Sequence, residues 1–252
     1  MRIGGITEMS TVDWYGNVSL VLFFAGCNLR CPYCHNSPLI PLDSGHEVNL
    51  GYLKDSMVTG MEPVPQLDSV VFTGGEPTLQ PDAVIAAAEL TREFGLDIML
   101  DTNGTLYDSV KKVLETGYFK RVALDIKAPL NSEEYGVVTG RPEIGEKYSE
   151  NVKKTLTLCK KLGLEIEART TVAPGLSDDL GFIKRIAKDI KDSITVYYLQ
   201  QFDNQGDVLD PELKKMERPS REKLVKLAKV ALEEGVDPVY IKTRFDGLEL
   251  IQ

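Results

Sequence analysis

Three cysteines within eight residues are the chemically richest feature of the sequence. Cys27, Cys31 and Cys34 are spaced C-x-x-x-C-x-x-C, and they follow directly after a predicted strand at 19–24. Three thiolates on one loop can bind three corners of an iron–sulfur cube, whereas cysteine ligation normally supplies four. If no fourth protein ligand is added, one iron stays open for a substrate, as one position does at catalytic zinc.

Two other kinds of site are compatible with these residues taken alone. Cys31 and Cys34 form a C-x-x-C pair that could act as a redox dithiol, although that chemistry does not require Cys27. A structural zinc site could add His35, but this residue is adjacent to Cys34, which makes shared tetrahedral ligation awkward. We expect the remaining cysteine, Cys159, to be a small buried residue without a chemical role.

Short apolar runs alternate with helical stretches along most of the chain. Strands are predicted at 19–24, 69–73, 97–101, 121–127, 165–172 and 195–200. Helices are predicted at 82–94, 108–115, 149–161, 178–191 and 220–234. The segment 36–49 is interpreted as a loop and 206–218 as irregular. This alternation predicts βαβ units with a parallel sheet, either curled into an open barrel or flat and doubly wound.

A second candidate site follows the second predicted strand, in the run Thr73-Gly74-Gly75-Glu76. Two glycines allow the backbone to approach a ligand closely, and Glu76 adds a negative charge. The run could equally be an ordinary turn between a strand and a helix. Its position on the strand after the cysteine loop is what favours a binding function.

Charged residues lie at the ends of the next strands. Asp101 ends the third strand, and Asp125 and Lys127 share one face of the fourth because residues two apart point the same way. Arg169 lies in the fifth strand, where a buried charge needs a partner. These four side chains could neutralise one another and a zwitterionic ligand.

The cysteine spacing after a first strand, followed by Gly74-Gly75-Glu76, resembles the radical S-adenosylmethionine (SAM) superfamily. The resemblance implies a partial (β/α)6 barrel with parallel strands over residues 1–205 and a C-terminal extension, 206–252, packed on the same domain. It also implies a [4Fe–4S] cluster on Cys27, Cys31 and Cys34. In that superfamily the open iron chelates SAM, whose reductive cleavage yields a 5′-deoxyadenosyl radical that abstracts a hydrogen atom.

The same resemblance assigns most of the cofactor contacts. Tyr33 would pack near the adenine, and Thr73, Gly74, Gly75 and Glu76 would hold the methionine amino group. No catalytic residue is expected beyond the cluster and the cofactor.

Later motifs resemble the activating enzymes of glycyl radical enzymes, of the pyruvate formate-lyase type. These motifs are D-T-N-G at 101–104, L-D-I-K at 124–127 and R-T-T-V-A-P-G at 169–175. By this resemblance Asp101 and Asp125 lie beside a monovalent cation, Lys127 contacts SAM, and Arg169 belongs to the same site. Residues 3–13 resemble the activating proteins of anaerobic ribonucleoside-triphosphate reductase. The implied partners are a glycyl radical enzyme and a low-potential electron donor such as flavodoxin or ferredoxin.

One position departs from the pyruvate formate-lyase type. Asp203 stands where that type carries a histidine after the sixth strand, and residues after Gly206 match no motif. A second hypothesis therefore keeps the radical chemistry but gives it a small molecule or RNA as substrate, as in 7-carboxy-7-deazaguanine synthases. A non-catalytic zinc or dithiol protein is a third.

The bulk properties fit an ordinary globular protein. The chain has 252 residues, 42% of them hydrophobic, and a formal net charge of −9, which argues against nucleic acid and anionic membranes as partners. No apolar run reaches membrane-spanning length, and no signal peptide is visible at the start. We expect a cytoplasmic enzyme with no membrane association.

Overall fold

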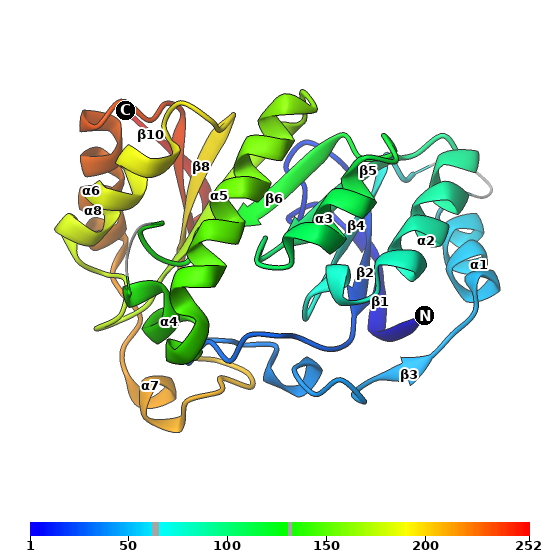
Figure 1. Ribbon diagram of the computed structural model, residues 1–252, viewed down its shortest axis with the longest axis horizontal. Coiled ribbons are helices and arrows are strands. Elements are labelled where there is room, and N and C mark those ends of the chain that lie inside the picture. Colours follow the sequence, from blue (N-terminus) through cyan, green and yellow to red (C-terminus); the bar gives the residue numbers. More distant parts are fainter. Residues whose placement is uncertain (62–65, 131–132) are drawn as a thin grey trace. The chain divides into compact units, whose positions relative to one another are not determined.

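The computed structural model describes residues 1–61, 66–130 and 133–252 as an α/β protein (Figure 1). The chain divides into two compact units, which are interleaved along the sequence. Unit 1 contains residues 1–28, 38–102 and 106–123, and unit 2 contains residues 29–37, 103–105 and 124–252. No helix in these described ranges is long and apolar enough to cross a membrane.

Unit 1 is built on strands in the order β5-β4-β2-β1-β3. The strands are β1 (Arg2–Ser10), β2 (Ser19–Phe24), β3 (His46–Glu47), β4 (Ser69–Gly74) and β5 (Asp97–Thr102). Strands β2, β4 and β5 are parallel, whereas β1 runs antiparallel to both β2 and β3. The helical elements are α1 (Leu50–Met61), η2 (Pro77–Leu79), α2 (Pro81–Glu93) and α3 (Tyr107–Leu114). The parallel strands therefore place their carboxyl ends, and the loops that follow, at one edge.

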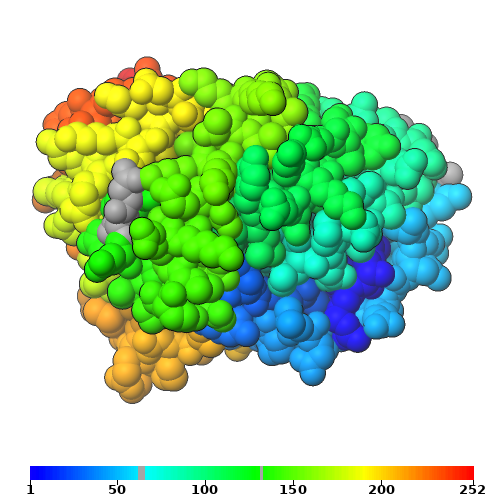
Figure 2. Space-filling model, in the orientation of Figure 1, coloured from blue at the N-terminus to red at the C-terminus, as the bar shows by residue number. Residues whose placement is uncertain are grey.

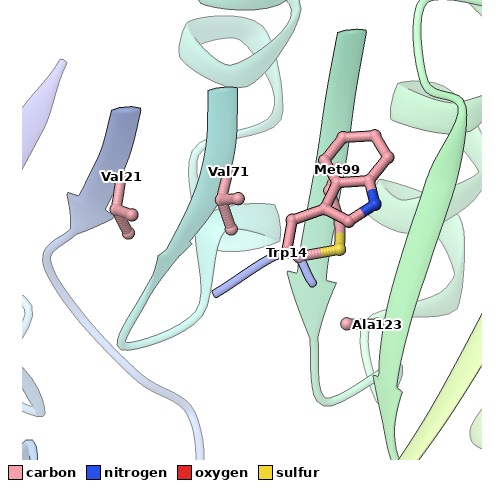
Figure 3. Close-up of a cluster of buried hydrophobic side chains, with 5 residues drawn as sticks. All are labelled: Trp14, Val21, Val71, Met99 and Ala123. Atoms are coloured by element: carbon pink, nitrogen blue, oxygen red, sulfur yellow. The ribbon is translucent and has the colours of Figure 1, made fainter. Parts of the chain in front are cut away.

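The indole ring of Trp14 packs in a hydrophobic cluster of unit 1. Trp14 comes from the β1–β2 connection and is buried with four strand residues (Figure 3). These are Val21, Val71, Met99 and Ala123. Because side chains alternate along a strand, the residues two positions further on, Thr73 and Asp101, lie on the same face of β4 and β5 as this cluster.

Unit 2 contains strands in the order β10-β9-β8-β7-β6. They are β6 (Arg121–Asp125, whose first three residues belong to unit 1), β7 (Glu165–Val172), β8 (Val196–Gln201), β9 (Val239–Thr243) and β10 (Gly247–Ile251). Strands β7, β8 and β9 are parallel, and β10 returns antiparallel to β9. The helical elements are α4 (Glu134–Val138), η3 (Pro142–Ile144), α5 (Gly145–Lys161), α6 (Leu180–Ile190), α7 (Pro211–Lys215) and α8 (Arg221–Glu233).

Asp or Ser side chains cap the N-termini of three of these helices. The Asp179 carboxylate accepts from the Phe182 backbone amide at 2.9 Å, at the start of α6. Ser220 accepts from Lys223 at 3.2 Å, at the start of α8, and Asp210 accepts from Glu212 at 2.8 Å, at the start of α7. Such N-caps satisfy amide donors that have no partner within the helix.

The structure confirms the predicted strands and helices, with ends displaced by at most four residues. The prediction was wrong for 206–218, which contains α7, because Asp210 caps a helix too short for a periodic pattern. The predicted loop 36–49 contains a 3-10 turn at Ser37–Leu39 and the two-residue strand β3. The sequence interpretation also missed β1, α1, α4, β9 and β10. The division at residue 205 stays a prediction.

Candidate active site

The cysteine loop of unit 2 is held by its backbone. Cys34 donates its amide to the Cys31 carbonyl at 2.9 Å, and Arg30 donates to Thr139 at 2.9 Å. Gly140 has φ +64°, and a Cβ there would come within 2.1 Å of the Arg30 carbonyl oxygen. The loop thus lies directly on the turn after α4, which only glycine can form at this distance.

A second set of backbone bonds joins the same loop to the segment before α7. Leu209 donates to the Cys34 carbonyl and Asp210 to the Pro32 carbonyl, both at 3.0 Å. The Ser37 hydroxyl donates to the Asp207 carbonyl at 2.6 Å. Residues 207–210 therefore act as a strap across the cysteine loop. Sequence reasoning did not identify this strap, because backbone pairing leaves no side-chain signature.

Lys127 is the central charge of unit 2. Its ammonium Nζ lies 2.9 Å from Asp125 Oδ2 and 5.8 Å from the centre of the Tyr33 ring. The Lys127 side chain is only 13% exposed, whereas that of Asp125 is 38% exposed. The structure thus brings together three of the predicted site residues, Tyr33, Asp125 and Lys127, beside the cysteine loop.

Electrostatic interactions tie the thiols to this lysine. Burial raises the pKa of Cys31 to about 11, and the nearby Lys127 charge opposes that rise. Burial also raises the pKa of Cys34. Burial disfavours the charged form of Lys127, but Asp125, Tyr33 and Cys31 outweigh it and hold the pKa of Lys127 well above its usual range. A permanent cation is therefore available to offset thiolate charge when metal binding releases the thiol protons.

Two further polar residues are buried in unit 2. The Arg169 Nε atom lies 2.5 Å from Glu167 Oε1, so the carboxylate seen beside Arg169 is one that sequence reasoning did not select. Tyr135 is fully buried, and its hydroxyl has no hydrogen-bond partner among the described residues. Lys127, Asp125 and Cys31 all influence the pKa of Tyr135, which burial raises. Tyr135 therefore belongs to the surroundings of the cysteine loop.

The glycine pair in unit 1 forms a close backbone contact. Gly75 donates to the Phe24 carbonyl at 2.9 Å, and Glu76 donates to the Gly26 carbonyl at 2.7 Å. A Cβ on Gly75 would lie 2.1 Å from the Gly26 carbonyl oxygen, and one on Gly74 would lie 2.2 Å from that of Phe24. Two glycines are required because the loop after β4 lies against the loop after β2 with no space for side chains.

Glu76 is a fully buried carboxylate in unit 1. Its Oε1 atom accepts from the Thr78 hydroxyl at 2.5 Å, from the Thr78 amide at 3.1 Å and from the Thr102 hydroxyl at 2.8 Å. These hydrogen bonds fix the orientation of the Glu76 side chain. A buried, oriented carboxylate of this kind can bind an ammonium group.

The other predicted residues of unit 1 occupy neighbouring strand ends. Thr73 lies on β4 opposite Phe23 of β2, and Asp101 directly precedes Thr102 on β5. Cys27 is half-buried, and its amide donates to the Ile40 carbonyl at 3.1 Å. Within unit 1 the predicted residues Cys27, Thr73 and Gly74 to Glu76 thus lie on the loops and ends of β2 and β4.

The residues fit an iron–sulfur cluster with a chelating amino acid ligand. Three cysteines lie within eight residues of the chain. In unit 2 the charge of Lys127 acts on Cys31, and in unit 1 a buried carboxylate follows a glycine pair with no room for a Cβ. Among the described residues, no three His, Cys, Asp or Glu side chains are gathered around one point.

Comparison with known proteins agrees with this chemistry. The radical SAM superfamily matches residues 21–186. The chain belongs to the radical SAM superfamily. A Methanocaldococcus jannaschii protein named as a glycyl-radical enzyme activating enzyme is 34% identical over 241 residues, which are 96% of this chain and 95% of that protein. The pyruvate formate-lyase-activating enzyme of Clostridium pasteurianum is 30% identical over 92% of this chain and 97% of its own length.

A solved structure shows the same fold. The radical SAM methyltransferase from Sphaerobacter thermophilus superposes with a TM-score of 0.72 at 14% identity, covering 91% of this chain and 67% of that one. The predicted fold class and the predicted resemblance to glycyl radical activating enzymes are therefore confirmed, and the chain is a radical SAM enzyme. The superfamily implies a [4Fe–4S] cluster and SAM. The residue assignments remain predictions.

Proposed function

We propose that this enzyme activates a glycyl radical enzyme by abstracting a hydrogen atom from a backbone glycine of that partner. The observation that carries the proposal is the end-to-end similarity to proteins named as glycyl radical activating enzymes. Anaerobic ribonucleoside-triphosphate reductase and pyruvate formate-lyase are the two partner classes that the sequence motifs favour. No feature of the site requires a small-molecule substrate.

The proposed ligand set combines the donor chemistry with the family resemblance. Cys27, Cys31 and Cys34 would hold the [4Fe–4S] cluster as thiolates, and the cluster would be left one protein ligand short for SAM. When bound and supplied with one electron, the cluster and SAM would provide the radical chemistry that removes a hydrogen atom from the glycine Cα.

The side chains of the chain bind and orient the cofactor. Glu76, held by Thr78 and Thr102, accepts from the methionine ammonium, and the glycine pair exposes backbone groups beside it. Lys127 offers its ammonium to an anionic group of SAM while Asp125 keeps it charged. The buried Tyr33 ring lies beside Lys127 and provides an apolar face for the adenine.

Other elements of the proposal rest on the family resemblance alone. A monovalent cation beside Asp101 and Asp125, a contact from Arg169, an electron donor such as flavodoxin or ferredoxin, and a cytoplasmic location all remain predictions.

The test is direct. Anaerobically reconstituted enzyme is incubated with SAM, dithionite and either anaerobic ribonucleotide reductase or pyruvate formate-lyase. We expect a glycyl radical doublet by electron paramagnetic resonance (EPR) and a matching amount of 5′-deoxyadenosine. Abundant 5′-deoxyadenosine with a small molecule, and no radical on either protein, would overturn the proposal.

A further inference from the structure

An exposed aromatic ring lies at the turn of the C-terminal hairpin of unit 2. The turn joins β9 to β10, and Phe245 within it is 82% exposed. Because β9 is parallel to β8, the turn lies at the carboxyl end of β8. Single exposed hydrophobic residues are common, so Phe245 alone proves nothing. The contacts made by the residues around Phe245 distinguish it from such isolated residues.

The turn is held in place by the loop that follows β8. The Arg244 amide donates to Gln201 Oε1 at 3.0 Å, and the Arg244 guanidinium forms an ion pair with Asp203. The guanidinium carbon of Arg218 lies 5.1 Å from the centre of the Phe245 ring. A ring fixed in this way loses little freedom when a partner covers it, which favours binding.

Two further exposed apolar residues lie in the segment that joins β8 to α8. Met216 is 44% exposed, and its carbonyl accepts from the Asn204 side chain at 3.0 Å. Leu209, also exposed, belongs to the strap and donates its amide to the Cys34 carbonyl. We call Leu209, Met216, Arg218, Arg244 and Phe245 the strap surface. The chain segment around α7, orange in Figure 2, lies at the molecular surface directly below the green atoms of α4 and α5.

We propose that the strap surface docks the polypeptide segment that carries the target glycine. The inference rests on the proposed function. A glycine within a folded partner must be presented beside the cysteine loop, and within unit 2 the strap surface is joined to that loop by backbone bonds. Aromatic and arginine side chains are the types that contribute most at protein interfaces.

The side chains of the strap surface indicate which class of partner it would bind. An apolar side chain next to the glycine would cover Phe245 and Met216, while backbone carbonyl oxygens would accept from Arg218. Carboxylates at Asp203, Asp207 and Asp210 in the same loop disfavour a phosphate backbone. A protein segment therefore fits better than RNA, and a small molecule would not need so extended a surface.

The experiment uses the full-length, cluster-reconstituted enzyme and the partner that yields a radical with the wild type. Glycyl radical formation is followed by EPR against partner concentration, and 5′-deoxyadenosine is measured without partner. For Phe245→Ala we expect the KM for the partner to rise about tenfold or more, as for an interface hot spot. Cluster content and partner-free SAM cleavage should be unchanged. Arg218→Met should have a smaller effect in the same direction.

Leu180→Ala is the matched control, because Leu180 is an exposed apolar residue of unit 2 at the start of α6. Its KM should equal that of the wild type. An unchanged KM in Phe245→Ala, with normal radical formation, overturns the docking proposal and leaves the activase function intact. Absence of any radical with the wild type and both partner classes overturns the function, and the docking proposal with it.

Discussion

The two units contain ligand-binding regions of opposite construction. In unit 1 the glycine pair and Glu76 form a closely packed frame, in which backbone atoms touch and two threonine hydroxyls orient one carboxylate. In unit 2 the corresponding region is ionic, with Lys127 between Asp125, Tyr33 and the cysteine loop. Close backbone packing therefore organises the region in unit 1, and charge organises the region in unit 2.

This difference teaches how each region should respond to mutation. A frame of touching backbones has no tolerance for added volume, because the neighbours cannot move aside. An ionic group tolerates changes in shape but not the loss of one charge, since that leaves the other uncompensated. Four substitutions test this contrast.

Among these substitutions, Gly75→Ala is expected to cause the largest loss of stability and of SAM binding. The new Cβ would lie 2.1 Å from the Gly26 carbonyl oxygen, a backbone atom that can shift only with its loop. We expect a loss of about 3 kcal/mol in the free energy of unfolding, the upper end for overpacking, and no detectable SAM binding. Urea unfolding and equilibrium dialysis with labelled SAM measure the two quantities.

Gly51→Ala is the control for this substitution. Gly51 is exposed in the first turn of α1, and the nearest atom to a new Cβ would be Asn49 Oδ1 at 3.0 Å, a side-chain atom that accepts from the Tyr52 amide. Alanine should change the free energy of unfolding by less than about 1 kcal/mol, because a side chain and no backbone carbonyl has to give way. Equal destabilisation by both substitutions would contradict the idea of a rigid frame.

Lys127→Met should have the next largest effect. It keeps the length of the side chain but leaves the Asp125 carboxylate without its 2.9 Å partner. We expect a loss of about 2 kcal/mol, less than for a fully buried pair because Asp125 is partly solvated. Partner-free 5′-deoxyadenosine formation should fall below detection.

Lys120→Met removes a comparable lysine from an exposed pair with Asp97 and should cost less than about 1 kcal/mol. If both lysine variants kept the wild-type stability and SAM cleavage, charge would not be the organising feature of unit 2.

Glu76→Gln separates the structural role of the carboxylate from its charge. The amide oxygen can still accept from Thr78 and Thr102, so the free energy of unfolding should fall by only about 1 kcal/mol. The affinity for SAM should fall about tenfold, or about 1.4 kcal/mol, because the ammonium loses its counter-charge. A variant with wild-type SAM affinity would remove Glu76 from the binding site.

Tyr135→Phe is expected to have the smallest effect. The hydroxyl is buried and has no hydrogen-bond partner in the described part of the chain, so its removal deletes no such bond. The free energy of unfolding should stay within about 0.5 kcal/mol of wild type or increase, since a desolvated hydroxyl is removed. A loss above about 2 kcal/mol would indicate that the hydroxyl makes an important bond in solution. Thermal unfolding followed by circular dichroism measures this change in stability.

The alternation of strands and helices was predictable because buried parallel strands such as β2 and β4 are continuous apolar runs. The cysteine loop, the glycine pair and the Asp125–Lys127 pair were recognisable from residue type, and the structure places Lys127 Nζ 2.9 Å from Asp125 Oδ2. Strand β1 was missed because Gly4 and Gly5 conceal its pattern. The strap depends on backbone pairing between distant segments, which sequence patterns do not encode. Glu167, in contrast, lies two residues from Arg169 on the same strand, so the rule that paired Asp125 with Lys127 could have selected it.

The strap also bears on what the cysteine loop requires of a bound metal. Its bonds to the loop run between backbone amides and carbonyls, from Leu209 to Cys34 and from Asp210 to Pro32, and no thiol takes part. The backbone of residues 32–34 is therefore supported by groups that metal binding does not use. A loop supported in this way loses less conformational freedom on binding a ligand than an unsupported loop does.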